Sequence, residues 1–398
     1  MTTVKSSEAD AAYSPVVQAE PLLLQPISLR GSTARNRIVL SPMSQYASIE
    51  GGPTDWHLAH FGKFSAGGAG IVFSEDTAIE ADGRGTPGCA GLYTSEHVRQ
   101  YRRITDFIKA QGAIPAIQLG HTGAKAGAKA PWADFDQASL GALAKRRISP
   151  SAVRLENDGY EPRAILTGEI PGVLELWRDA AARAVDAGYD ICEVHSAHGY
   201  LLHQFLSPLT NRRTDSYGGG LRGRMRFPLE VVETVRRVWP DDRPLFVRIS
   251  AVDGSNSGWT LDDSVEFARE LAARGVDVVD CSSGGLSGQL TSGPVQRKPG
   301  YQVEFAERIR RDAKVRTMAV GLITEPGQAE TVLRSGQADL VALGREMVLD
   351  PNWPTRAAST LGSIDPFQFI SPSYAWWLRR REELRNLGPK GDAPVSRS

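Results

Sequence analysis

Residues 169–200, EIPGVLELWRDAAARAVDAGYDICEVHSAHGY, contain the unit that decides the fold. The first part, residues 169–187, carries apolar residues at helical spacing, and Gly188 follows it as a helix-ending glycine. Residues 189–194 form a short apolar run with the length of a buried strand. Two histidines and a tyrosine come directly afterwards: His195, His198 and Tyr200. A helix that leads into a buried strand is the repeating pattern of a parallel sheet with helical crossovers.

The same alternation recurs along most of the chain. Glycines follow several predicted helices, and Thr260 with Asp263 three residues later forms a capping-box entry to another. Eight apolar runs have strand character: residues 37–40, 70–74, 114–119, 190–194, 245–249, 276–281, 317–320 and 338–343. Helical segments are predicted at residues 57–66, 95–111, 169–187, 222–238, 261–274, 303–311, 326–335 and near 352–360. Eight βα units predict an α/β fold, a (β/α)8 TIM barrel in a single domain.

The predicted domain organisation is a barrel with two extensions. Residues 1–24 are expected to be a flexible N-terminal tail, and residues 25–362 the barrel. Residues 363–398 are an aromatic C-terminal extension and tail, in which Phe369, Tyr374, Trp376 and Trp377 supply enough apolar area to predict docking. Long insertions at residues 120–167 and 206–221 are expected at the active-site end of the barrel.

Composition excludes several classes of function. The chain has 398 residues, with 46 Lys plus Arg and 46 Asp plus Glu, so no net field attracts nucleic acid or an anionic membrane. Its three cysteines, Cys89, Cys192 and Cys281, are too scattered for a disulfide framework or an iron–sulfur cluster. No secretory signal or membrane-spanning run is visible. A cytoplasmic protein without nucleic-acid or membrane partners is expected.

Polar residues at the predicted strand ends indicate a cofactor site. Gly321 follows the seventh strand and Gly344-Arg345 the eighth, where bare N–H groups and a guanidinium suit a phosphate, although turn glycines alone also explain Gly321. Arg248, within the fifth strand, needs an anion, an electron-rich partner or a structural salt bridge. Gln118 offers a donor and an acceptor to the edge of a planar heterocycle. FMN fits this set better than pyridoxal phosphate, because no strand-end lysine is present.

His195, His198 and Tyr200 allow three interpretations. They can converge on one pocket, stabilise an oxyanion and deliver a proton. Alternatively, His195 is a satisfied core histidine and His198 a loop residue. The His-x-x-His spacing also suggests a metal, but a catalytic zinc usually takes a third protein ligand and no obvious one lies nearby, so metal is the weaker hypothesis.

Several ordered motifs resemble those of the Old Yellow Enzyme ene-reductases, and especially their thermophilic-like bacterial subclass. The motifs are NRIVLSPM at 36–43, QLGHTG at 118–123, HSAHGYLLHQFLSP at 195–208, NRRTDSYGG at 211–219 and GRE at 344–346. The resemblance spans roughly residues 22 to 380. It implies an FMN-dependent (β/α)8 barrel that reduces activated C=C bonds of α,β-unsaturated carbonyl compounds with NADPH or NADH, and a homo-oligomer such as a dimer or tetramer.

The resemblance also implies a role for each matching residue. His195 and His198 hydrogen-bond the substrate carbonyl, Tyr46 is a further donor to the substrate oxygen, and Tyr200 protonates the α-carbon. Cofactor contacts fall to Ser41, Pro42, Met43 and Ser44 along the flavin, Asp76 through its backbone, Gln118 at the pyrimidine edge, Arg248 beside N1 and O2, and Gly321, Gly344 and Arg345 at the phosphate. No metal is implied.

Three positions depart from the pattern of these relatives. Ser44 replaces a cysteine that tunes the flavin, Asp76 replaces a small residue, and Trp376 stands where relatives often have an arginine that reaches into a neighbouring subunit. Other functions are also compatible with the sequence. They are a flavoenzyme of the same barrel specialised for enoyl or aromatic acyl thioesters or nitro compounds, a flavin-binding protein without turnover, and a metal-dependent hydrolase using His195 and His198.

Overall fold

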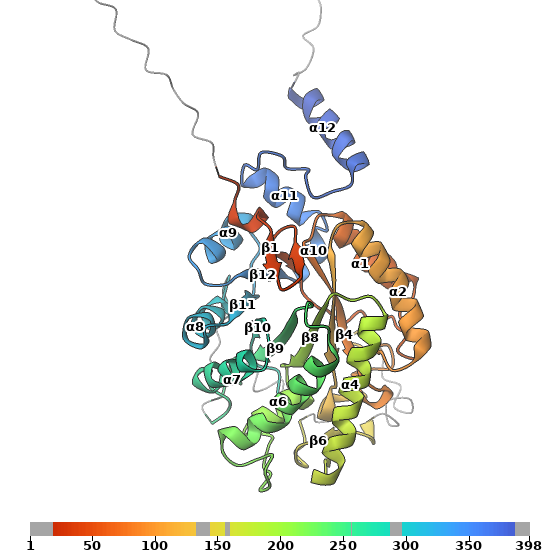
Figure 1. Ribbon diagram of the computed structural model, residues 1–398, viewed down its shortest axis with the longest axis vertical. Helices are drawn as coiled ribbons and strands as arrows, with labels where there is room; N and C mark the ends of the chain where they lie inside the picture. Colours follow the sequence, from red (N-terminus) through yellow and green to blue (C-terminus); the bar gives the residue numbers. More distant parts are fainter. Residues whose placement is uncertain (1–18, 133–143, 156–159, 256, 287–296, 387–398) are drawn as a thin grey trace, which may run out of the picture.

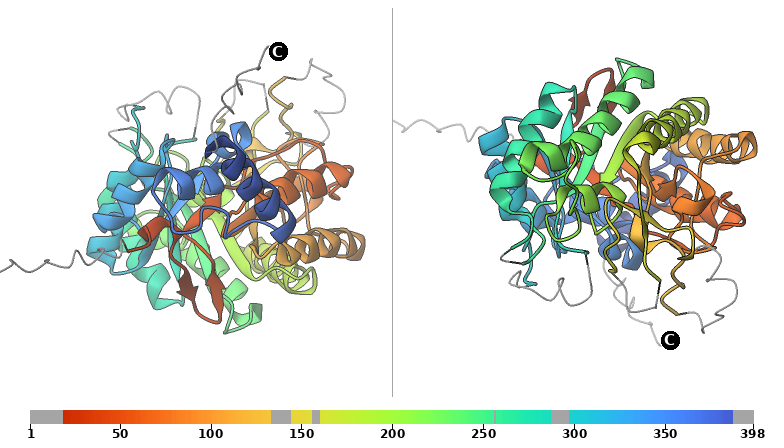
Figure 2. Two further views of the ribbon diagram at one scale, coloured as in Figure 1. Left: turned by 90° about the horizontal axis from the view of Figure 1, so that it is seen from above. Right: turned by 90° about the horizontal axis from the view of Figure 1, so that it is seen from below.

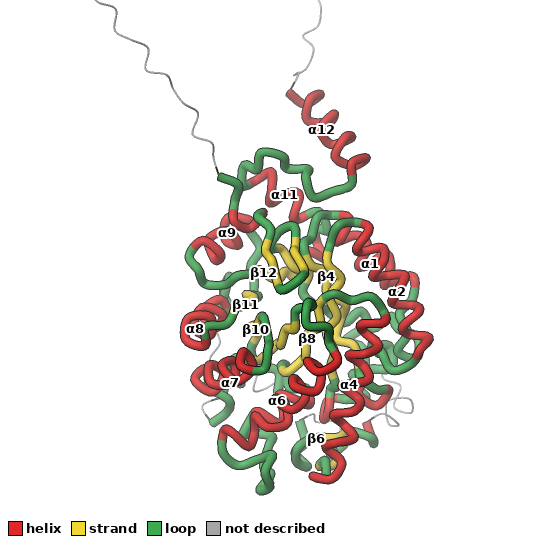
Figure 3. The backbone as a smooth tube through the Cα atoms, viewed as in Figure 1, coloured by secondary structure: helices red, strands yellow, loops and turns green. Residues whose placement is uncertain are grey.

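Eight parallel strands close into a barrel, as predicted (Figures 1 and 3). The computed structural model describes residues 19–132, 144–155, 160–255, 257–286 and 297–386. Around the barrel, the hydrogen-bonded order is β10-β11-β12-β3-β4-β5-β8-β9. The strands are β3 (Ile38–Leu40), β4 (Ile71–Ala78), β5 (Ile114–Gly120), β8 (Ile191–Ser196), β9 (Leu245–Ser250), β10 (Val278–Ser282), β11 (Arg316–Ala319) and β12 (Leu340–Leu343). The (β/α)8 prediction is therefore confirmed.

A ring of helices surrounds these strands in all three views (Figures 1 and 2). The predicted helices correspond to α1 (Asp55–Ala66), α2 (Ser95–Ala110), α4 (Ile170–Asp186), α6 (Leu221–Val238), α7 (Leu261–Ala273), α8 (Val303–Ala313), α9 (Pro326–Arg334) and α11 (Trp353–Thr360). The side chain of Thr260 accepts a hydrogen bond from the backbone N–H of Asp263, as its capping motif predicts. Gly188, which follows α4, has a φ of 86°, a conformation that costs glycine nothing.

Several short elements and one longer helix have no counterpart in the sequence prediction. The short elements are the hairpin of β1 (Ile27–Leu29) and β2 (Ser32–Ala34), the strands β6 (Ile148–Ser149) and β7 (Arg163–Ala164), and the helices α5 (Leu201–Leu206) and α10 (Arg345–Leu349). The longer helix is α12 (Pro372–Asn386), which has 15 residues. Periodicity cannot identify strands of two or three residues or helices of five or six, because such segments complete too few repeats. β6 and β7 lie within the predicted insertion 120–167, of which residues 133–143 and 156–159 are outside the described residues.

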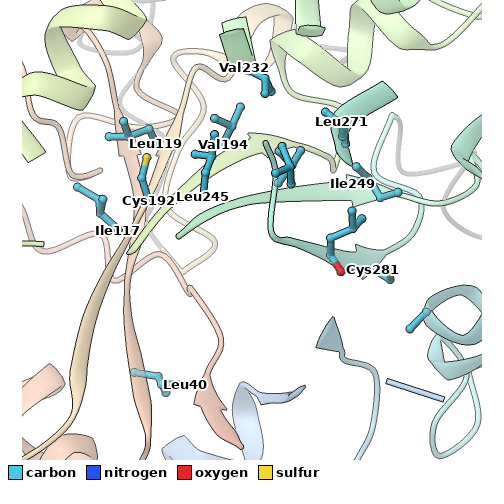
Figure 4. Close-up of a cluster of buried hydrophobic side chains, with 14 of the residues drawn as sticks. Leu40, Ile117, Leu119, Cys192, Val194, Val232, Leu245, Ile249, Leu271 and Cys281 are labelled. Carbon is cyan, nitrogen blue, oxygen red and sulfur yellow. Dashed lines mark hydrogen bonds between the residues drawn. The ribbon is translucent and has the colours of Figure 1, made fainter. Parts of the chain in front are cut away.

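Alternation along each strand divides the buried side chains into two layers. Side chains such as Phe73, Phe246 and Met318 fill the interior of the barrel. Those of the opposite strand face, including Cys192, Val194 and Leu245, pack between the barrel and its helices (Figure 4). Fully burying one such side chain stabilises the fold by about 1.5–3 kcal/mol. All three cysteines are buried and free.

The two chain ends meet the body of the barrel in different ways. Leu23 and Leu24, which fall within the predicted N-terminal tail, are buried, and Glu330 accepts the backbone N–H of Leu23 at 2.8 Å. The packed chain thus begins before the predicted boundary, and residues 1–18 lie outside the described residues. At the other end, Phe369 is buried, whereas α12 projects from the body beyond α11 (Figure 1). Its side chains Tyr374, Trp376, Trp377 and Leu384 are exposed.

Candidate active site

The predicted site residues lie at the carboxyl ends of the barrel strands. Ser41, Pro42, Met43, Ser44 and Tyr46 follow β3, and Asp76 and Gln118 lie in the last parts of β4 and β5. His195 belongs to β8 and Arg248 to β9, while His198 and Tyr200 lie in the turn after β8. Gly321 follows β11, and Gly344 and Arg345 follow β12. Active sites of this fold form at the same end of the barrel.

Four of these residues line one cavity. Arg248, Gly321, Gly344 and Arg345 enclose a cavity of about 450 Å³ together with Ser282, Tyr301 and Gln302. An added Cβ at Gly321 would lie 2.8 Å from Gln302 Oε1, and one at Gly344 would lie 3.1 Å from Met43 Sδ. Within the described residues the exposed guanidinium of Arg345 makes no hydrogen bond or ion pair. Narrow backbone walls and a free guanidinium suit a phosphate group.

His195, His198 and Tyr200 form a cluster of rings beside this cavity. The ring centroids of His195 and His198 are 5.1 Å apart, and those of His195 and Tyr200 are 4.7 Å apart. His198 Nε2 lies 2.7 Å from Ser282 Oγ, so Ser282 connects the cluster to the cavity that it also lines. Convergence on one pocket is one of the three interpretations that the sequence allows, and the rings lie in contact in the structure.

Both histidines are held in the uncharged form. Burial and the positive charge of Arg248 hold the pKa of His195 and of His198 well below the usual value. His195 Nδ1 accepts the backbone N–H of Ala197 at 3.2 Å, so its remaining proton lies on Nε2. Burial, reinforced by Asp76, raises the pKa of Tyr200 well above its usual range. The cluster therefore carries neutral groups that can donate hydrogen bonds or a proton.

A polar layer lies inside the barrel next to the histidines. Gln118 Nε2 donates to Glu193 Oε1 at 2.7 Å, and Arg248 Nε lies 3.0 Å from Asp280 Oδ2. The second contact is an ion pair without hydrogen-bond geometry, because both atoms lack a hydrogen-bond partner. Burial, with the neighbouring Asp280, raises the pKa of Glu193 well above its usual range, and burial raises that of Asp280. Arg248 thus has the structural salt bridge that was one of its interpretations, and it also lines the cavity.

Asp76 is a buried carboxyl group at the end of β4. Its Oδ1 has no hydrogen-bond partner in the described chain, and it occupies the space in which a side chain at Gly120 would begin. Burial, with the negative charge of Glu75, raises its pKa to about 8. Its charge would in turn raise the pKa of Tyr46 and of Tyr200, so the carboxyl group lies within electrostatic range of both.

A buried hydrogen bond between His57 and Glu75 anchors the loop after β3. His57 Nε2 lies 3.0 Å from Glu75 Oε1, and the other oxygen of Glu75 accepts the backbone N–H of Gln45 at 2.8 Å. His57 Nδ1 accepts the backbone N–H of Thr54, so Nε2 carries the proton that is donated to Glu75. The next residue, Tyr46, has a φ of 56°, which is uncommon for a bulky side chain. This anchor fixes the loop that presents Met43, Ser44 and Tyr46.

Several residues that shape the site have no role in the sequence-based prediction. These are Glu75, Lys125, Glu193, Asp280, Ser282 and Gln302. The strand alternation could have identified Glu193 and Asp280. Each lies two residues from another polar residue of its strand, as Glu193 does from His195. Residues two apart share one face of a strand, so these side chains face the barrel interior. Lys125 and Gln302 come from connecting segments, whose approach to the site no local pattern encodes. Lys125 Nζ donates to the carbonyl oxygen of His198 at 3.1 Å.

Within the described parts of the chain, no three His, Cys, Asp or Glu side chains converge in a way that would hold a metal ion. Among the same residues, no helix combines the length and apolar character needed to cross a membrane.

Comparison with known proteins defines the chain further. The profile of the NADH:flavin oxidoreductase / NADH oxidase family matches residues 22–363. An NADPH dehydrogenase of Geobacillus sp. (strain WCH70) is 41% identical over 346 residues, which cover 86% of this chain and 96% of the relative. One from Bacillus subtilis (strain 168) is 39% identical with the same coverage.

Solved structures give a consistent result. Morphinone reductase in complex with tetrahydroNAD has a TM-score of 0.71 and 28% identity, covering 88% of this chain and 95% of that one. The old yellow enzyme homologue of Zymomonas mobilis has a TM-score of 0.72 and 26% identity, covering 89% and 98%.

The fold and the strand-end cluster define a TIM-barrel enzyme with a cofactor-sized cavity. The chain belongs to the NADH:flavin oxidoreductase / NADH oxidase family, the Old Yellow Enzymes, and is an oxidoreductase. The resemblance found in the sequence motifs is thereby confirmed.

Proposed function

We propose that this protein is an FMN-dependent NADPH dehydrogenase that reduces the activated C=C bond of α,β-unsaturated carbonyl compounds. The observation that carries the proposal is the cluster of two uncharged histidines and a protonated tyrosine, connected through Ser282 to a cavity suited to a phosphate. NADPH is preferred to NADH as the reductant because the relatives from Geobacillus and Bacillus subtilis are NADPH dehydrogenases.

The residues present fit FMN. Gly321, Gly344 and Arg345 would hold the phosphate, and Ser41, Pro42, Met43 and Ser44 would lie along the ring system. Because Gln118 Nε2 is bonded to Glu193, its Oε1 remains to accept an N–H at the pyrimidine edge. Arg248 would supply positive charge beside the ring, and Asp76 would contact it through the backbone. When bound, FMN supplies hydride transfer from the nicotinamide to the substrate carbon.

The protein's own groups would bind and protonate the substrate. His195 donates from Nε2 to the carbonyl oxygen, and His198 donates from Nδ1 because its Nε2 faces Ser282. Ser282 Oγ accepts an N–H of Gln302, so its own proton is available for His198 Nε2. These bonds strengthen as negative charge grows on the oxygen during attack at the β-carbon. Tyr200 then delivers its hydroxyl proton to the α-carbon, and Tyr46 adds a donor to the substrate oxygen.

The decisive experiment uses the visible spectrum of the purified protein. We expect an oxidised-flavin spectrum that bleaches with NADPH in the absence of oxygen and returns when cyclohexenone is added. A colourless protein, or a flavin that NADPH reduces but no enone, maleimide or nitroalkene reoxidises, would contradict the proposal. In parallel assays, reoxidation of the flavin by enoyl thioesters but not by cyclohexenone would support the alternative, a flavoenzyme specialised for thioesters.

A homo-oligomer is part of the same proposal. The exposed aromatic side chains of α12 supply apolar area that a second copy of the chain would cover. Light scattering of the wild type should therefore give a dimer or tetramer, and Trp376→Ser with Trp377→Ser should shift it toward the monomer. An unchanged mass in that variant would place the interface elsewhere.

A further inference from the structure

A fully buried network connects α5 to the segment after β9, outside the proposed catalytic groups. His203 Nε2 lies 2.8 Å from Asp253 Oδ1, and neither side chain is exposed to solvent. The other oxygen, Asp253 Oδ2, accepts the hydroxyl of Ser207 and the backbone N–H of Trp259, each at 2.6 Å. On its second nitrogen, His203 Nδ1 accepts the backbone N–H of Gly199 at 2.8 Å.

The partners of His203 determine where its proton lies. A backbone N–H can only donate, so Nδ1 is an acceptor and Nε2 carries the proton donated to Asp253. Burial raises the pKa of Asp253, but the hydrogen bonds from His203, Ser207 and Trp259 outweigh burial and lower it overall. The carboxylate therefore stays ionised and orients the imidazole, in the way that an outer carboxylate fixes the orientation of a functional histidine.

Gly199, the residue that His203 binds, lies between His198 and Tyr200. His198 has a φ of 57° and Gly199 a φ of 72°, so two successive residues adopt the left-handed conformation. For a residue other than glycine this conformation is unfavourable and persists only when its surroundings hold it. An added Cβ at Gly199 would lie 2.1 Å from the carbonyl oxygen of Gly285. The turn therefore packs so closely against the segment after β10 that no side chain fits at Gly199.

Both ends of the Gly199 residue are bonded to side chains of α5. Its N–H is bound by His203 and its carbonyl oxygen accepts Gln204 Nε2 at 2.7 Å. The N–H of His198 is satisfied separately by Ser250 Oγ at 2.9 Å. His203 thus accepts the N–H of Gly199, which lies between His198 and Tyr200, the residues that would bind and protonate the substrate.

We propose that His203 and Asp253 are positioning residues, which fix the turn that presents His198 and Tyr200 to the substrate; this inference rests on the proposed function. The network is not a second hydrolytic site. The hydroxyl of Ser207 donates to the aspartate and not to the imidazole, and all three side chains are buried, so no nucleophile is activated or accessible.

Three variants separate positioning from general stability. His203→Met removes both hydrogen bonds at similar volume, whereas His203→Gln keeps an acceptor for Gly199 and a donor for Asp253. Asp253→Asn keeps an oxygen that accepts from His203, but it places its amide N–H against the backbone N–H of Trp259. A backbone N–H cannot accept a hydrogen bond, so this contact is lost. Each holoenzyme is examined by amide exchange over residues 197–201, by phenol titration of the oxidised flavin, and by the rates of reduction with NADPH and reoxidation with cyclohexenone.

In His203→Met we expect faster amide exchange at Gly199 and weaker phenol binding. Reoxidation of the flavin by cyclohexenone should slow by up to about a hundredfold, whereas its reduction by NADPH should change little. The reason is that misplaced catalytic groups lower the rate without loss of the cofactor. His203→Gln should restore most of each value. Wild-type exchange and reoxidation in His203→Met, or equal impairment in His203→Gln, would overturn the proposal. If His203→Met does not fold, Asp253→Asn decides by the same pattern, and wild-type values there refute positioning. Wild-type enzyme that is inert to cyclohexenone contradicts the proposed function, while exchange at Gly199 still tests the positioning.

Discussion

Gln118 and Glu193 face each other inside the barrel, where the amide Nε2 of Gln118 donates to Oε1 of Glu193 at 2.7 Å. The same carboxyl group leaves Oε2 buried without a hydrogen-bond partner among the described residues. An ionised carboxylate in that position would be costly, and its pKa is raised accordingly. Glu193 therefore acts as a neutral acceptor that orients the amide of Gln118, the residue proposed to meet the edge of the cofactor.

Replacing Glu193 should distinguish its shape from its charge. Glu193→Gln preserves an acceptor for Gln118 and should retain flavin and stability at neutral pH. Glu193→Leu leaves the Gln118 donor buried and unpaired, which should lower the free energy of unfolding by about 1–3 kcal/mol and reduce flavin content. Urea unfolding and the flavin-to-protein absorbance ratio measure both effects. Equal losses in the two variants would show that a negative charge at Glu193 is required.

Asp76 should make stability decrease with rising pH. Its folded pKa of about 8 lies above the ordinary value of 3.8, so the folded state binds its proton more tightly than the unfolded state does. Between these two values each pH unit costs at most about 1.4 kcal/mol of stability, and the cost is complete above pH 8. Asp76→Asn removes this ionisation and should be more stable than wild type at pH 8.5 by a larger margin than at pH 5. Parallel stability profiles of the two proteins would exclude a buried neutral Asp76.

Arg345 should contribute to cofactor retention without contributing to the fold. Its guanidinium has no partner in the described chain, and a charge-assisted bond to a phosphate is worth about 1.5–3 kcal/mol. Arg345→Ala should therefore raise the dissociation constant of FMN by on the order of tenfold to a hundredfold, with an unchanged melting temperature of the flavin-free protein. Arg316→Ala is the matched control, because Arg316 begins β11 at the opposite end of the barrel. Equal FMN affinity in both variants would remove Arg345 from the phosphate site.

The barrel was predictable because each of its units carries its own signal. The run of residues 190–194 behind a long amphipathic helix is readable without knowledge of any other unit, and the same holds for the other seven strands. The His195 and His198 pair was predictable for the same reason, since local order alone places both at a strand end.

Other features depend on contacts between distant segments. The left-handed turn at His198 is held by Ser250, His203 and Gly285, which come from three different segments. The neutral state of Glu193 depends on burial inside the barrel and on Asp280, which is distant in sequence. No local pattern encodes these proximities. The packing of Leu23 and Leu24 was missed because a short apolar segment looks like a tail until its partner Glu330 is known.

His195 and His198 should both be uncharged when they bind the substrate carbonyl group. Because both pKa values lie well below the usual 6.5, phenol binding to the oxidised flavin should not change between pH 6 and 7 through histidine titration. His195→Ala with His198→Ala should keep the flavin but weaken binding by on the order of tenfold to a hundredfold, the value of two lost hydrogen bonds. His198→Asn retains a donor and should lose less. Unchanged phenol affinity in the double variant would refute the assigned roles.

Tyr200 should matter in only one of the two half-reactions. A proton donor positioned for the α-carbon contributes on the order of 10²–10⁴ to the rate of alkene reduction, but it has no role when NADPH reduces the flavin. Tyr200→Phe should therefore slow reoxidation by cyclohexenone by that factor and leave the reductive rate unchanged. Tyr101→Phe is a suitable control, because Tyr101 is a buried tyrosine that packs against Tyr189 and not against the histidine pair. Since burial holds the pKa of Tyr200 well above its usual range, wild-type reoxidation should not decline up to pH 9 through loss of this proton. Equal slowing of both half-reactions in Tyr200→Phe would assign the residue to flavin placement instead of proton delivery.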